Sequence, residues 1–136
     1  MKNYIAIALV LMFANHSISQ EYSKKDIIGK WKVIEVLKKT ENPNLNDLIK
    51  SFSTASFQFN EDSSFRITTL NKSKVFDMLI NMTRTAKWRL NENNFSVNIG
   101  DDSNQFNILK IIIVKVDEKI VFHLTETELN LEVVKE

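Results

Sequence analysis

The feature of this sequence that most restricts its fold is an alternation of apolar and polar residues, repeated in short runs along the chain. In residues 56–60, for example, Phe57 and Phe59 fall on the same side of an extended chain, and residues 95–99 repeat the pattern. This period of two is typical of strands with one buried face. The chain has only two glycines and one proline, so asparagine, which tolerates left-handed backbone conformations, supplies many of the turn residues.

Eight runs of this kind are expected to form strands. Their approximate ranges are 31–37, 56–60, 65–70, 87–90, 95–99, 105–117, 120–124 and 129–134. Most are separated by short polar turns, which favour antiparallel neighbours. The pattern therefore predicts an all-β domain, built as an eight-stranded antiparallel up-and-down β-barrel.

Two segments have the apolar spacing of a helix instead, and they predict two short helices within the barrel domain. Residues 44–52 show this spacing after Pro43, which suits a first helical turn, and Asn42 is the expected cap. Residues 73–82 repeat the spacing, with Ser73 as the expected cap. We expect both helices to lie near a mouth of the barrel or to plug one end.

Residues 1–19 are typical of a secretory signal peptide, with a basic start, an apolar run and small residues before an expected cut between Ser19 and Gln20. The apolar run is shorter than the roughly 20 residues of a membrane span, so no stable span is expected after cleavage. An uncleaved N-terminal helix is the alternative. Cleavage would leave residues 20–136 as a single domain, and we expect it to be periplasmic or secreted.

Charge and composition exclude several classes of function. The chain has 18 basic and 17 acidic residues, so it lacks the basic excess that nucleic-acid binding requires. It has no cysteine, which excludes disulfides, thiolate metal sites, cysteine nucleophiles and a lipid-anchored cysteine. His123 is the only histidine beyond the signal segment, so no metal site is expected. We also expect no cofactor. Asp62 and Asp101 belong to acidic pairs in turns, where acidic residues are common. Since the sequence also contains no known catalytic motif, we expect that the protein is not an enzyme.

Several short motifs, taken together in their order and spacing, resemble a known family. They are Gly29-Lys30-Trp31 at the head of the first strand, the Phe57–Asp62 strand and turn, Trp88 at the start of the fourth strand, and the 122–131 ending. Over residues 27–135 the chain resembles the small bacterial lipocalin-like domain family, within the lipocalin and calycin group.

The resemblance implies a barrel with a central cavity for a small apolar ligand. It also implies that Trp31 closes one end of the barrel, with a basic residue near the chain end packed over its ring. Lys135 is the candidate for that position, where lipocalins prefer arginine because its planar guanidinium stacks better on an aromatic face.

The period-two pattern also predicts which side chains face into the barrel. The inward set is Trp31, Val33, Phe57, Phe59, Phe65, Ile67, Trp88, Leu90, Phe95, Val97, Phe122, Leu124, Leu129 and Leu131. An eight-stranded barrel is just wide enough to be filled by such side chains or to hold one small ligand.

The candidate ligand-binding residues combine part of that inward set with the second helix. They are Trp31, Phe57, Phe59, Phe65, Ile67, Phe76, Met78, Met82, Trp88 and Phe122. Among them, Phe76, Met78 and Met82 would form a flexible lid, because methionine adapts to varied apolar shapes. Ordinary core packing is the alternative role for each.

The surroundings of two polar residues and of one long strand can also be predicted. Glu35 shares the predicted face of Trp31. Because burying a lone carboxylate is costly, it would need a partner such as Arg66, Arg89 or the polar head of a ligand, or else a position in water at the rim. His123 is expected to point outward. Within the long strand expected at 105–117, residues 108–114 are apolar on both faces, so the outer face must be covered by a helix, by the N-terminal segment or by a second subunit in a homodimer.

The leading hypothesis is an exported lipocalin-like protein that binds a small hydrophobic ligand non-covalently in its barrel. The alternative is a protein-interaction or structural module of the cell envelope, with a filled barrel and no small-molecule ligand.

Overall fold

A computed structural model describes residues 22–38, 42–91 and 95–136. The predicted signal peptide and its cleavage site lie outside these residues. The helices are α2 (Lys24–Ile27), α3 (Asn46–Ser53) and α4 (Lys74–Met82), with 3-10 turns η1 (Pro43–Leu45) and η2 (Asp102–Asn104). The strands are β1 (Gly29–Lys38), β2 (Ala55–Phe59), β3 (Phe65–Thr69), β4 (Lys87–Asn91), β5 (Ser96–Gly100), β6 (Leu109–Val116), β7 (Lys119–Leu124) and β8 (Leu129–Lys135).

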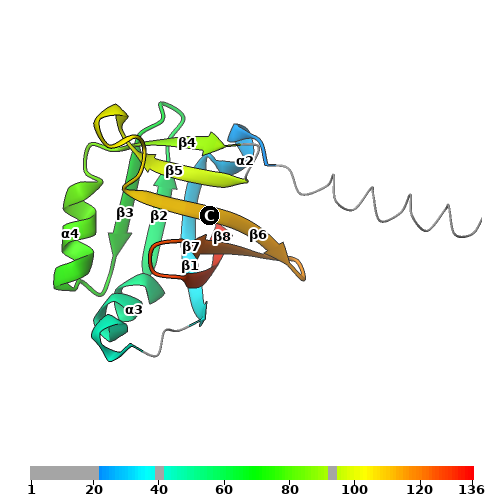
Figure 1. The fold of residues 1–136 in the computed structure, drawn as a ribbon. Helices are drawn as coiled ribbons and strands as arrows, with labels where there is room; N and C mark the ends of the chain where they lie inside the picture. Colours follow the sequence, from blue (N-terminus) through cyan, green and yellow to red (C-terminus); the bar gives the residue numbers. More distant parts are fainter. Residues whose placement is uncertain (1–21, 39–41, 92–94) are drawn as a thin grey trace, which may run out of the picture.

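The eight strands form one antiparallel sheet in the order β3-β2-β1-β8-β7-β6-β5-β4, curled into a nearly closed barrel. The predicted all-β barrel with two short helices is therefore confirmed. Helices α3 and α4 lie together on one side of the barrel, and α2 lies on the other (Figure 1). The two ends of the barrel are therefore covered by different helices (Figure 1).

The start of each predicted helix agrees with its cap. The Asn42 side chain accepts a hydrogen bond from the Asn44 N–H and begins η1, which leads into α3. The Ser73 hydroxyl oxygen accepts the Phe76 N–H at 3.2 Å and begins α4. These bonds satisfy backbone donors that a first helical turn leaves without an internal partner.

Two predicted strand boundaries were wrong. The strand expected at 105–117 begins only at Leu109, because η2 and left-handed residues Gln105 and Phe106, at φ 57° and 55°, precede it. Phe95 was expected inside β5, but it stands before that strand with φ 51° and is half-buried. In both places a left-handed turn interrupts an apolar alternation that looks continuous in the sequence.

The predicted facing of β1 also changes along the strand. Its pairing with β8 shifts register between Val33 and Glu35, so Val36 enters the core and Glu35 is exposed. A bulge adds one residue to a strand and exchanges its two faces beyond that point. Glu35 therefore reaches water without needing a buried partner.

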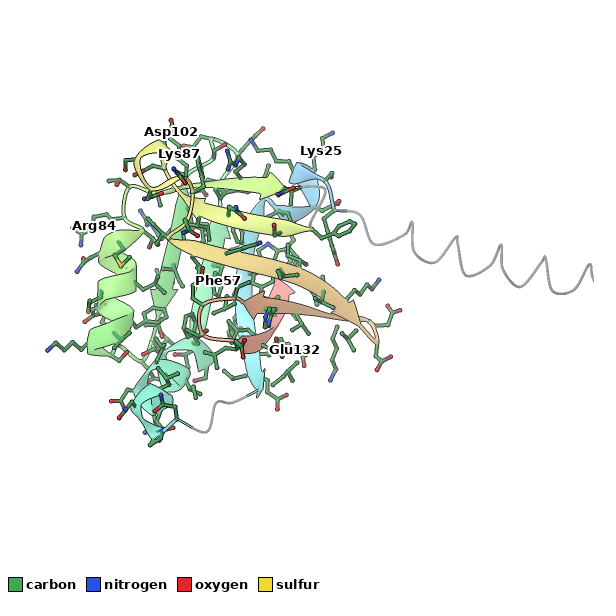
Figure 2. The ribbon with its side chains drawn as sticks, viewed as in Figure 1. Lys25, Phe57, Arg84, Lys87, Asp102 and Glu132 are labelled. Atoms are coloured by element: carbon green, nitrogen blue, oxygen red, sulfur yellow. The ribbon has the colours of Figure 1, made fainter. Side chains whose placement is uncertain are left out.

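The interior is filled with aromatic rings. Phe57, Phe59 and Phe122 are at most 1% exposed. The centroid of the Phe122 ring lies 5.5 Å from that of Phe57 and 6.3 Å from that of Phe59, both in edge-on contact. Figure 2 shows Phe57 within the barrel. Such ring pairs add to the stabilisation that comes from burial alone.

Closure of the barrel between β3 and β4 depends on Trp88. A single bridge pairs Ser64 with Lys87, and the Trp88 N–H donates to the Ser63 carbonyl at 2.9 Å. The indole Nε1–H donates to the Asn60 carbonyl at 2.9 Å, and the ring lies 5.5 Å from that of Phe59. No described residue pairs β3 with β4 beyond this bridge.

The other tryptophan closes the barrel end beneath α2. Trp31 Nε1–H donates to the Ile27 carbonyl at 2.8 Å, and the Lys135 Nζ stands 5.6 Å from the ring centroid, as the resemblance implies. The same Nζ donates to the Asp26 carbonyl at 3.1 Å. Both bonds occupy carbonyls at the end of α2, where a helix lacks internal partners.

Gly29 is required by this arrangement. Its φ is +137°, a conformation that favours glycine, and an added Cβ would lie 2.7 Å from the Cε of Lys135. We predict that Gly29→Ala lowers the free energy of unfolding by about 1–3 kcal/mol, because the backbone is strained and Lys135 is pushed from the Trp31 ring. Urea unfolding measures this loss.

The matched control is the same change in a Lys135→Ala background. There the side-chain clash is gone and only the backbone strain remains, so the loss should be smaller. An unchanged stability for Gly29→Ala alone would show that the glycine is not required.

The turn between β2 and β3 predicts an acid sensitivity. Hydrogen bonds from the Ser64 hydroxyl, at 2.6 Å, and from the Ser64 N–H lower the pKa of Asp62 below its ordinary value. A carboxyl whose pKa is lower in the folded state stabilises the protein above its unfolded pKa, near 3.8, and loses that contribution as the pH falls through the folded pKa. Asp62→Asn should therefore lose less stability than the wild type between pH 7 and acid pH. Denaturant midpoints compare the two, with Glu118→Gln in another turn as the control, and an equal acid loss would contradict the assignment.

Candidate functional site

An apolar groove of about 200 Å³ lies where α3 and α4 meet the barrel. Helix α3 contributes Leu48 and Phe52, and α4 contributes Val75, Met78, Leu79 and Met82. The remaining wall comes from Ile108, Leu109, Leu124, Glu126 and Thr127, around the start of β6 and the β7–β8 turn. We call this site the apolar groove.

The two sides of α4 explain why the groove is open. Phe76 is fully buried and its ring meets that of Phe52 edge-on, with 5.1 Å between centroids, so it anchors the helix. Val75, Met78 and Met82 are 51%, 57% and 55% exposed. Of the predicted lid, Met78 and Met82 therefore line an accessible groove, whereas Phe76 belongs to the core.

Two polar residues lie at the groove beside the β7–β8 turn. The Glu126 Oε1 accepts the N–H of Lys110 at 3.1 Å, which holds the carboxylate in place. The Thr127 hydroxyl oxygen is buried and has no hydrogen-bond partner among the described residues. An unpaired buried hydroxyl is unfavourable, and native structures contain few of them.

The other candidate residues lie away from the apolar groove. Trp31, Phe57, Phe59 and Phe122 are buried in the aromatic interior, with Trp31 and Phe122 centroids 5.4 Å apart. Trp88 closes the barrel near α2. Phe65 and Ile67 are buried on β3 and form part of a second groove beside α4.

Histidine and the acidic turns have local structural partners. His123 is half-buried on the outer face, and its Nδ1 lies 2.6 Å from the Asn130 Oδ1. Hydrogen bonds from Ser103 and from backbone N–H groups lower the pKa of Asp101 and fix the start of η2. Within the described ranges, no three His, Cys, Asp or Glu side chains converge as a metal site would require.

Sequence reasoning missed the groove residues outside α4. Leu48 and Phe52 carried a signal, because their helical spacing defines one apolar face of α3. Thr127 carried none, since nothing in a turn sequence shows that a hydroxyl will be buried without a partner. The groove depends on how helices and turn meet, which local periodicity does not specify.

The fold and groove define a class: a nearly closed eight-stranded antiparallel barrel, with an aromatic interior and an apolar groove under two helices. Residues 14–111 match the family model described as Domain of unknown function (DUF5004), and the chain belongs to that family. No curated protein and no solved structure matches the chain. Within the described residues, no helix has both the length and the apolar character needed to cross a membrane.

Burial predicts different roles for neighbouring residues of α4. Phe76→Ala should lower the free energy of unfolding by about 3–5 kcal/mol, because it removes a buried ring and leaves a cavity. Met78→Ala should change it by no more than about 0.5 kcal/mol, since that side chain is mostly exposed. Urea unfolding of both variants measures the contrast, and similar losses would contradict this division of α4.

Proposed function

We propose that this protein binds a small apolar molecule non-covalently in the apolar groove, rather than in the centre of its barrel. The observation that carries the proposal is the open apolar face of α4 at Val75, Met78 and Met82. Burying such a surface against an apolar ligand is favourable in proportion to the area removed from water. The barrel supplies a rigid wall for the site.

The size and chemistry of the groove narrow the ligand class. Its volume of about 200 Å³ is below the range of about 300–1,000 Å³ typical of drug-sized ligands, so the ligand is small or only part of it enters. Rotation of the Thr127 side chain about its Cα–Cβ bond would let the unpaired hydroxyl form a hydrogen bond with one polar group of the ligand. A short apolar chain or ring with a single polar end fits these features.

The predicted signal segment, residues 1–19, supports binding outside the cytoplasm. We propose that the mature domain works in the periplasm or in the medium, where it would hold or carry its ligand. This function requires no catalytic step.

The test is titration of the domain with N-phenyl-1-naphthylamine, a neutral apolar dye whose fluorescence rises when it leaves water. We expect binding that octanol displaces. Met78→Glu combined with Met82→Glu should weaken it at least about tenfold, because a charge in the groove must lose its hydration when the ligand enters. Both methionines are exposed, so the variant should fold.

Val114→Glu is the matched control, because Val114 is an exposed apolar residue on β6 and does not line the groove. It should leave dye affinity unchanged. Lack of dye binding by the wild type, or equal affinity in the methionine variant, would contradict the proposal.

A second candidate function is a contact between two copies of this chain through the outer face of β6. Val114 and Val116 are 39% and 49% exposed on that face, which favours an interface over a fully solvated strand. Sedimentation equilibrium should then show a dimer that Val114→Glu dissociates. A monomer at all protein concentrations would remove this candidate.

A further inference from the structure

The second groove lies on another side of α4, where the barrel fails to close. Its volume is about 420 Å³. Strand β3 lines it with Phe65, Arg66, Ile67 and Thr68, and the second half of α4 and the residues after it contribute Ile80, Thr83 and Arg84. We call it the arginine groove, because arginines from two separate parts of the chain, Arg66 on β3 and Arg84 after α4, line it.

The backbone of β3 faces this groove with free hydrogen-bonding groups. The Asn60 N–H donates to the Ser64 carbonyl, so hydrogen-bonded pairs with β2 continue at alternate residues, Arg66 and Thr68. The N–H and carbonyl of Ile67 therefore point away from β2, toward the gap. Beyond the Ser64–Lys87 bridge, no described strand lies opposite to accept them.

The charges at the groove are both positive and lack acidic partners. Neither Arg66 nor Arg84 forms an ion pair with any carboxylate among the described residues. Arg84 Nη2 donates to the Asn81 Oδ1 at 2.9 Å, which leaves its other N–H groups available. Figure 2 shows Arg84 at the end of α4. Since the whole chain is almost neutral, two positive charges lining one groove are a local feature.

The walls between the charges are apolar. Phe65 and Ile67 are at most 4% exposed, and Ile80 is half-buried against the core. The Thr83 hydroxyl already donates to the Leu79 carbonyl at 2.8 Å, so it is engaged within the helix. A ligand here would meet two guanidinium groups, a backbone edge and an apolar floor.

We propose that the arginine groove binds a small organic anion, with a carboxylate, sulfate or phosphate group on an apolar stem. Guanidinium groups bind such oxyanions through paired, charge-assisted hydrogen bonds. The Ile67 N–H adds a neutral donor, and the stem lies against Phe65 and Ile80. This site is separate from the apolar groove and does not depend on the function proposed for it.

The experiment is a titration of ¹⁵N-labelled protein (residues 20–136) with phenyl phosphate, followed by amide chemical shifts. We expect the largest shifts at Ile67, Thr68 and Arg84. Arg66→Gln and Arg84→Gln should each weaken binding about tenfold, the loss typical of one hydrogen bond to a charged group, and the double variant should show no saturable binding. All these arginines are exposed, so the variants should fold.

Arg89→Gln is the matched control, because it removes the same charge from β4, where the guanidinium lies 4.3 Å from the Phe106 ring centroid. It should bind phenyl phosphate as the wild type does. Benzyl alcohol tests the need for charge, and inorganic phosphate tests the need for the stem; both should bind at least about tenfold more weakly than phenyl phosphate.

Three results would overturn the proposal. They are an absence of shifts at these amides, equal weakening in Arg89→Gln, and inorganic phosphate or benzyl alcohol binding as tightly as phenyl phosphate. The apolar dye titration is independent of each of them.

Discussion

The barrel depends on the contacts that Trp88 makes across its one weak seam. Strands β3 and β4 are the two ends of the sheet order, and among the described residues a single bridge joins them. Trp88 reinforces that bridge with a backbone bond to Ser63, an indole bond to Asn60 and ring contact with Phe59. Lys24 of α2 adds a cation 5.5 Å from the ring centroid and a bond to Ser63 Oγ. Trp88 thus holds β3 and β4 together at one end of the seam. Beside α4 no described residue continues the pairing.

Helix α2 links this seam to the first and last strands. Lys24 reaches toward Trp88, while the carbonyls at the other end of the helix receive Trp31 and Lys135. Two tryptophans therefore hold one end of the barrel, each with a lysine near its ring. On the opposite side, α3 and α4 pack together through the contact between the rings of Phe52 and Phe76. This leaves other faces of α4 to form the two grooves.

Much of this architecture could be predicted from the sequence, because strand alternation and helix caps are local. The helix starts were predicted from the capping residues Asn42 and Ser73. The buried face of β2 was predicted from the alternation of Phe57 and Phe59. The errors arose where backbone geometry changes without a compositional signal. The bulge after Val33 exposes Glu35, and left-handed residues at Phe95, Gln105 and Phe106 shorten apparent strands. The grooves were beyond prediction in detail, because each combines residues distant in the chain, such as Leu48 with Thr127.

The pairing of β1 with β8 has a consequence for how the chain folds. Trp31 lies opposite Lys135. The first strand along the chain, β1, therefore pairs on one side with β8, the last strand along the chain. Contacts between distant residues slow folding, because a long loop must close before they form. A polypeptide that has not yet been synthesised to Lys135 has β1 without this neighbour and the Trp31 ring without its cationic cover. The pairing of β1 with β8 therefore cannot form until the chain has been synthesised through β8.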